Sequence, residues 1–215
     1  MVRTAFFRPN SSGMPVLLFA PGAGAPASSA WMEAWGRRLS ALGKVIRFDY
    51  PYMVAGRSRP DRLAVLLAAH AEALRKVQAE SPGPVVLVGK SMGSRIGCHL
   101  ALIADVAGLV CLGYPLRGAR GDLRDQVLLA LHTPILFVQG SRDPLCPLDA
   151  LETVRARMAA KSSLHLVEGG DHSLRVGVRA LRDRGETQAD VDARILGAIT
   201  DFVARLPTAP SAVAR

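Results

Sequence analysis

Cysteine, aromatic residues and long apolar runs are all scarce in this 215-residue sequence. Its three cysteines, Cys98, Cys111 and Cys146, lie far apart and include no Cys-x-x-Cys pair. This spacing excludes a disulfide framework and a paired-cysteine zinc or redox site, and it fits a reducing compartment. No apolar run approaches the ~20 residues of a membrane-spanning helix. We therefore expect a cytoplasmic protein that has no membrane partner.

Charge is plentiful but not clustered. The net charge of +9 comes from arginines scattered along the chain, and the eleven aromatic residues provide no stacking surface beside them. Because nucleic-acid binding needs a basic patch or a recognisable reading motif, we expect no nucleic-acid partner. Many arginines and alanines with few lysines indicate a GC-rich, bacterial source. No composition shift or repeat divides the chain, so we expect one domain over residues 1–207 and a frayed tail over residues 208–215.

Short apolar runs alternate with amphipathic helical patterns along the whole chain. This alternation predicts an α/β fold with a doubly wound, mostly parallel sheet of about six to seven strands, helices on both faces and no large lid. The expected strands are Val16–Ala20, Lys44–Asp49, Val85–Gly89, Leu109–Gly113, Ile135–Gly140 and Leu164–Glu168. The expected helices are Ser29–Leu42, Asp61–Glu80, Met92–Ala104, a short one around Leu123–Leu131, Leu148–Ala160 and Ala189–Leu206.

One buried strand runs through a G-x-S-x-G motif directly into a helix. Gly89 and Gly93 flank Ser91 at two residues on either side, as a very sharp strand-to-helix turn requires. Such a turn lifts the Ser91 hydroxyl above the sheet edge. It also leaves the Met92 amide at a helix N-terminus, where the N–H and the helix dipole stabilise an oxyanion. The motif therefore predicts a nucleophilic serine.

An acid and a histidine follow this serine in the chain. Asp143 comes just after one apolar strand, and His172 comes just after the next. Because the carboxyl ends of parallel strands meet at one edge of a sheet, we expect Ser91, His172 and Asp143 to meet there. In that arrangement His172 is the base and Asp143 orients it.

Other residues remain candidates for these roles. Asp171 and Glu168 are alternative acids, although Asp171 is also well placed to cap a turn. His70 and His99 lie on apolar helix faces, so we interpret them as core histidines. His132 precedes a strand and His165 lies within one, which places both on the wrong side of the expected geometry.

The loop over residues 21–27 follows the first strand, where a second oxyanion donor is normally found. Ala23 is the expected amide donor. The same loop contains Gly22-x-Gly24-x-x-Ala27, and Asp49 ends the next expected strand, a pattern that also fits an NAD(P)-binding enzyme. Pro26 argues against this alternative because it stands where helix amides would hold a pyrophosphate.

Substrate contacts are expected from residues that follow the strands at the same edge: Gly22, Gly24, Lys90, Tyr114, Tyr52 and Leu145. Aromatic side chains at such positions also often serve packing. Basic residues in these loops suggest attraction of an anionic substrate: Lys90, Arg57, Arg117, Arg142 and Arg175. Solvated charges or structural pairs, such as Arg95 with Asp49, are the favoured interpretation. No spacing typical of metal ligands occurs, and we expect no metal or organic cofactor.

Six segments of the chain resemble the α/β-hydrolase superfamily: PGAGAP, RFDYPYM, GKSMGSR, CLGYPL, QGSRDP and GDH. More narrowly, they are similar to its small, lidless, dienelactone-hydrolase-like branch. That branch includes testis-expressed hydrolase-like proteins and a subunit of a histone acetyltransferase complex. Two positions depart from relatives: Ser91 stands where dienelactone hydrolases carry cysteine, and Pro21 stands where many relatives carry histidine.

The resemblance implies a serine hydrolase that cleaves a small carboxylic ester or thioester through an acyl-enzyme on Ser91. It implies His172 as base, Asp143 as orienting acid, and the amides of Met92 and Ala23 as the oxyanion hole. We expect a small-molecule substrate as the partner and a monomer or homodimer. Because the chromatin-associated member of the branch acts largely within an assembly, a non-catalytic interaction protein is the alternative.

Overall fold

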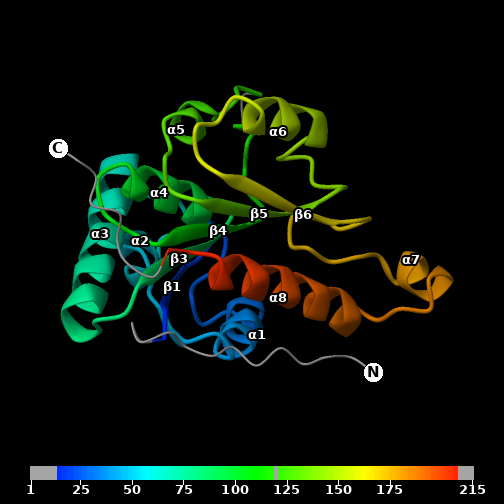
Figure 1. Ribbon diagram of the computed structural model, residues 1–215, viewed down its shortest axis with the longest axis horizontal. Coiled ribbons are helices and arrows are strands. Elements are labelled where there is room, and N and C mark those ends of the chain that lie inside the picture. Colours follow the sequence, from blue (N-terminus) through cyan, green and yellow to red (C-terminus); the bar gives the residue numbers. More distant parts are fainter. Residues whose placement is uncertain (1–13, 119–120, 208–215) are drawn as a thin grey trace.

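Six parallel strands form one twisted sheet in the computed structural model, which describes residues 14–118 and 121–207 (Figure 1). The expected tail over residues 208–215 lies outside the described residues. The strands are β1 (Val16–Ala20), β2 (Lys44–Arg47), β3 (Val85–Lys90), β4 (Gly108–Leu112), β5 (Ile135–Gly140) and β6 (Ser162–Val167). Their order across the sheet is β2-β1-β3-β4-β5-β6. The predicted α/β class with a doubly wound sheet is therefore confirmed.

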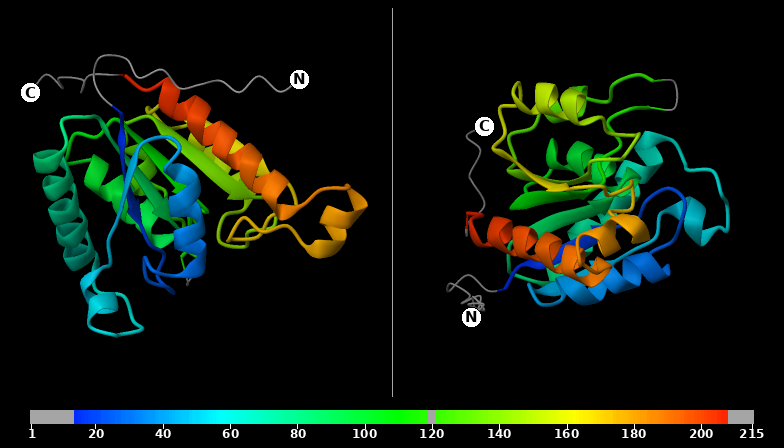
Figure 2. Two further views of the ribbon diagram at one scale, coloured as in Figure 1. Left: turned by 90° about the horizontal axis from the view of Figure 1, so that it is seen from below. Right: turned by 90° about the vertical axis from the view of Figure 1, so that its right-hand side faces the viewer.

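Helices cover both faces of the sheet, because successive strand residues point to opposite faces and both faces are apolar. The helices are α1 (Ala30–Leu39), α3 (Leu63–Glu80), α4 (Met92–Ala101), α5 (Gln126–Leu129), α6 (Leu148–Arg155) and α8 (Gln188–Ala204). Figure 2 shows α1 and α8 on one face of the sheet and α3 and α4 on the other. In β1, Leu17 and Phe19 join a core with α1 and α8, whereas Val16 and Leu18 join a core with α3 and α4. In the described ranges, no helix is long and apolar enough to cross a bilayer.

Two short helices were not predicted, and several predicted ones are shorter. Helix α2 (Pro51–Val54) is a single turn that begins at a proline, and α7 (Val178–Asp183) buries no residue, so neither has a readable apolar stripe. Helix α4 ends at Ala101, three residues before the predicted end at Ala104, and Ile103 beyond it is 70% exposed. Strand β2 ends at Arg47, two residues before Asp49.

The strand order places the point where successive connections diverge between β1 and β3. Strand β1 pairs with β2 on one side and with β3 on the other. The connections after β1 and β3 therefore leave in opposite directions, and ligands of open α/β sheets bind where such connections diverge. Ser91 follows β3, and the loop over residues 21–27 follows β1, so both lie at this point.

Candidate active site

Ser91 sits in a strained turn between β3 and α4. Its φ of 49° and ψ of −113° lie outside the regions that side-chain-bearing residues normally adopt, which costs about 1–3 kcal/mol. A side chain at Gly89 would place Cβ 2.2 Å from the Ser94 nitrogen, and one at Gly93 would place it 2.5 Å from the Ala20 oxygen. The two glycines therefore let the turn close, and the hydroxyl stands at the sheet edge.

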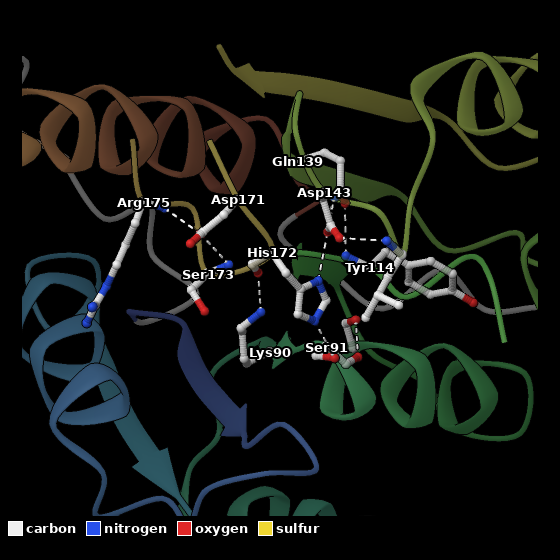
Figure 3. A network of polar contacts seen from close by, with 11 residues as sticks. Lys90, Ser91, Tyr114, Gln139, Asp143, Asp171, His172, Ser173 and Arg175 are labelled. Atoms are coloured by element: carbon white, nitrogen blue, oxygen red, sulfur yellow. Dashed lines mark hydrogen bonds and ion pairs between the residues drawn. The ribbon is translucent and has the colours of Figure 1, made fainter. Parts of the chain in front are cut away.

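A chain of hydrogen bonds joins the serine, the histidine and the acid (Figure 3). His172 Nε2 lies 2.8 Å from Ser91 Oγ, and His172 Nδ1 lies 2.7 Å from Asp143 Oδ2. The Asp143 side chain is completely buried, while that of His172 remains 26% exposed. The imidazole can thus take a proton from the hydroxyl on one side while the carboxylate holds it on the other.

Asp143 is held by two further donors. Gln139 Nε2 donates to Asp143 Oδ2 at 2.5 Å, and the Leu145 amide donates to Oδ1 at 2.9 Å. Burial opposes ionisation of Asp143, but the hydrogen bonds from His172, Leu145 and Gln139 and the charge of His172 outweigh it, so the pKa of this carboxyl is lowered. An ionised Asp143 accepts from Nδ1 and leaves His172 Nε2 free to accept from Ser91.

The alternative acids serve loop structure instead. Asp171 Oδ1 accepts from the amides of Ser173 at 2.7 Å and Arg175 at 2.9 Å, which is the turn-capping role foreseen for it (Figure 3). Glu168 accepts from the Ser141 hydroxyl at 3.1 Å. Asp143 alone among the three contacts the His172 ring.

The two amides predicted to form the oxyanion hole belong to Met92, directly after Ser91, and to Ala23, in the loop that follows β1. The Met92 amide begins α4, and a Cβ added at Gly22 would lie 3.5 Å from Ser91 Cβ, so the loop that contains Ala23 packs against the turn. Neither the Met92 nor the Ala23 amide donates to an acceptor in residues 14–118 and 121–207. Tyr52 Oη donates to the Ala23 carbonyl at 2.8 Å and holds this loop from α2.

Three of the residues expected to contact substrate do not face it. Tyr52 and Tyr114 are 1% and 0% exposed, and Lys90 is 8% exposed. The expectation is wrong because each of these side chains is directed inward to a main-chain carbonyl. Tyr52 Oη donates to that of Ala23 at 2.8 Å, Tyr114 Oη to that of Arg124 at 3.2 Å, and Lys90 Nζ to that of His172.

The other three expected substrate residues are more open. Leu145 is 37% exposed, Gly24 has open space around it, and Gly22 packs against Lys90 and Ser91. These positions are still compatible with a substrate-lining role.

The predicted pair of Arg95 with Asp49 is also wrong. Asp49 Oδ1 accepts from the Ala27 amide at 2.6 Å, and Arg95 forms no ion pair within the described parts of the chain. The Asp49 carboxylate is therefore bonded to the loop over residues 21–27. This bond argues against the NAD(P)-binding alternative, because that alternative needs the Asp49 carboxylate to bind a ribose. Arg57 pairs with Asp61 at 2.7 Å. The other loop arginines are exposed, as expected of solvated charges: Arg117, Arg142 and Arg175.

Sequence reasoning missed two residues of the network. Gln139 is completely buried and links Asp143 to the Tyr114 amide, which donates to Gln139 Oε1 at 3.0 Å. A polar residue near the end of an otherwise apolar strand was the available signal. Trp31 on α1 donates from Nε1 to the Ser173 carbonyl at 3.0 Å, and nothing in its sequence context indicates that contact.

A groove lies away from this site. It has a volume of about 710 Å³ and runs between β2, α2 and α3, with Ile46, Phe48 and Val54 in its wall, and it includes none of the three hydrogen-bonded residues. In the two ranges that the structure covers, no three His, Cys, Asp or Glu side chains gather as a metal site would require.

Comparisons with known proteins identify the family to which this fold belongs. The family model described as "Alpha/beta hydrolase domain" matches residues 13–204. The structure is similar to an α/β serine hydrolase without a lid from Xanthomonas campestris, with TM-score 0.67, 19% identity and coverage of 94% of this chain and 88% of that one.

Two further solved structures have the same fold. One is a serine hydrolase homologue from Coxiella burnetii, with TM-score 0.64, 18% identity and coverage of 89% and 84%. The other is a cold-adapted esterase from an Arctic intertidal metagenomic library, with TM-score 0.65, 17% identity and coverage of 91% and 84%. Because the family model spans most of its length, this chain belongs to the alpha/beta hydrolase domain family.

Proposed function

We propose that this protein is a serine hydrolase that cleaves a small carboxylic ester or thioester through an acyl-enzyme on Ser91. The observation that carries the proposal is the 2.8 Å contact between Ser91 Oγ and His172 Nε2, with Asp143 on the far side of the ring. Family membership and the strained turn at Ser91 support it.

In the first half of the reaction, Ser91 Oγ attacks the substrate carbonyl carbon as its proton passes to His172 Nε2. The carbonyl oxygen becomes an oxyanion that the Met92 and Ala23 amides stabilise, because donors held in place need no reorganisation as charge develops. Asp143 stabilises the imidazolium without taking its proton. When the intermediate collapses, the bond to the leaving group breaks and His172 returns the proton to the departing alcohol or thiol.

In the second half, water takes the place of the leaving group. His172 Nε2 accepts a proton from the water as its oxygen attacks the acyl carbon, and the same two amides hold the oxyanion. Collapse breaks the bond to Ser91 Oγ, which recovers its proton from His172, and the carboxylic acid leaves. No step needs a metal or an organic cofactor.

The finer assignments rest on motifs and composition. We place the protein in the small, lidless, dienelactone-hydrolase-like branch, as one domain over residues 1–207 that acts in the cytoplasm of a bacterium as a monomer or homodimer. One of the similar structures is an esterase, which supports a small ester as substrate.

The test is hydrolysis of p-nitrophenyl acetate and of a short acyl thioester by the wild-type protein, by Ser91→Ala and by Ser40→Ala. Ser40 is an exposed serine at the end of α1 and serves as the matched control. We expect the wild type and Ser40→Ala to hydrolyse at least one substrate at equal rates and Ser91→Ala to be inactive. A folded wild type that hydrolyses neither substrate would contradict the proposal and favour the non-catalytic alternative. Equal, measurable rates in the wild type and Ser91→Ala would also contradict it, because they would show that Ser91 is not the nucleophile.

A further inference from the structure

The side chain of Lys90, the residue directly before Ser91, points into the protein. Lys90 is 8% exposed, and its ammonium donates to the main-chain carbonyl of His172 (Figure 3). The same ammonium lies 5.6 Å from the centre of the Trp31 ring, a distance typical of a cation–π contact. Lys90 therefore connects the turn that carries the serine to the loop that carries the histidine.

Trp31 makes the matching contact one residue further along that loop. Its indole Nε1 donates to the Ser173 carbonyl at 3.0 Å, so two consecutive carbonyls, of residues 172 and 173, are held by side chains from β3 and α1. Gly113 closes the space beside them: it has a φ of 68°, and a Cβ there would lie 2.6 Å from the His172 carbonyl oxygen and 3.1 Å from Lys90 Nζ. The backbone of residues 172 and 173 is thus fixed from several directions.

Holding a lysine in this place is costly for folding. Burial lowers the pKa of Lys90 to about 8, while the nearby charges of Asp143 and Asp171 act in the opposite direction. Within the described residues, its ammonium forms no ion pair. A methionine would fill similar volume without desolvating a charge, and apolar replacements of buried charges are often neutral or stabilising. Stability alone therefore does not account for the lysine.

We propose that Lys90 and Trp31 are positioning residues that hold the backbone of His172 and Ser173, so that the imidazole stays between Ser91 Oγ and Asp143. The inference rests on the proposed role of His172 as base. Neither side chain touches the reacting atoms; both act through the carbonyls of the histidine loop. Burying the ammonium lowers stability, but it fixes the position of the proposed base His172. The distance from that base to the serine controls proton transfer.

The test uses Lys90→Met, which removes the ammonium, and Trp31→Phe, which keeps a ring but removes the indole donor. Lys76→Met, on the exposed face of α3, and Trp35→Phe, a buried tryptophan of the same helix α1, are the matched controls. Three quantities are measured for each: the rate of covalent labelling by a fluorophosphonate, the melting temperature, and the low-field proton NMR resonance of the His172 Nδ1–H.

We expect Lys90→Met to slow labelling by about 10- to 100-fold, the range for losing a hydrogen bond from a charged donor, and Trp31→Phe to slow it by up to about tenfold, the range for a neutral one. The low-field resonance shifts or broadens in both variants, and the melting temperature of Lys90→Met stays equal to the wild type or rises. The two controls leave the labelling rate and the resonance unchanged.

Unchanged labelling and an unchanged resonance in both variants would overturn the inference. If Lys90→Met fails to fold, Trp31→Phe alone decides by the same criteria. A folded wild type that is not labelled at all contradicts the proposed hydrolase function. In that case the resonance still tests the positioning role: a shift in both variants supports it, and no shift overturns it.

Discussion

Two histidines of this protein lie against a hydroxyl group, and their surroundings give them opposite properties. His172 contacts Ser91 Oγ through Nε2 and Asp143 through Nδ1, and its side chain is 26% exposed. His70, on α3, contacts Tyr50 Oη through Nδ1 at 3.2 Å, is completely buried, and leaves Nε2 without a partner in the described structure. His172 lies at the carboxyl edge of the sheet, whereas His70 lies in the buried interior of the protein.

The difference lies in what happens when each ring accepts a proton. A protonated His172 is held by the carboxylate of Asp143 and by solvent. A protonated His70 faces no carboxylate, and burial lowers its pKa to about 3. Burial also raises the pKa of Tyr50, so no proton moves between Tyr50 and His70. A hydroxyl beside an imidazole is therefore not enough to identify a base; a carboxylate partner and partial exposure distinguish His172, the proposed base, from His70.

Replacing His172 should break the comparison most completely. We expect His172→Ala to lower kcat/KM for a small ester by about 10⁴- to 10⁶-fold, because the serine loses the group that takes its proton. His132→Ala, an exposed histidine before β5, is the control and should match the wild type. Less than a tenfold loss in His172→Ala would show that another base serves Ser91.

Replacing the acid should have the next largest effect. Asp143→Asn keeps the shape of the side chain but favours the wrong ring tautomer, and we expect kcat to fall by about 10⁴-fold. Steady-state kinetics together with circular dichroism would separate this loss from unfolding. Glu168→Gln, at an alternative acid that does not contact the ring, should leave kcat within a few fold. If the two variants lose activity equally, Asp143 is not the orienting acid.

The buried histidine should affect stability and its pH dependence, not catalysis. An unfolded His70 binds a proton below its ordinary pKa of 6.5, while the folded form does so only near 3. Between these values the unfolded state holds more protons, so the free energy of unfolding falls as the pH falls, by up to about 1.4 kcal/mol per pH unit. Urea unfolding at pH 7, 6, 5 and 4 should show a shallower acid loss in His70→Leu than in the wild type. Equal slopes would contradict this account of His70.

The two tyrosines give the smallest expected difference. Tyr52→Phe removes the hydrogen bond to the Ala23 carbonyl and should lower kcat by up to about tenfold, the worth of one ordinary hydrogen bond. Tyr50→Phe removes only the contact to His70 and should leave kcat unchanged. Stopped-flow or steady-state rates on one ester would compare them directly. A larger loss in Tyr50→Phe than in Tyr52→Phe would reverse the roles assigned to them.

Strand positions could be predicted because buried parallel strands are short apolar runs between helical patterns. The meeting of Ser91, His172 and Asp143 followed from the same reasoning, since each residue lies in the connection that follows a parallel strand. Helix α7 could not be predicted, because it buries no residue and so has no periodic pattern.

The directions of the side chains near the carboxyl edge of the sheet could not be predicted from the sequence in the same way. Lys90 ends β3 and Tyr52 lies in α2, and at both positions the side chain could point either outward or inward. Only the fold shows that they reach main-chain carbonyls of residues 172 and 23. Trp31 is a further case, because its acceptor lies 142 residues away in the chain.

Intact-protein mass spectrometry after treatment with a fluorophosphonate tests the central claim most directly. The account predicts one added adduct on the folded wild-type protein, mapped to the peptide that contains Ser91, and none on Ser91→Ala or on heat-unfolded protein. A folded wild type that stays unmodified, or an adduct that persists in Ser91→Ala, would contradict it.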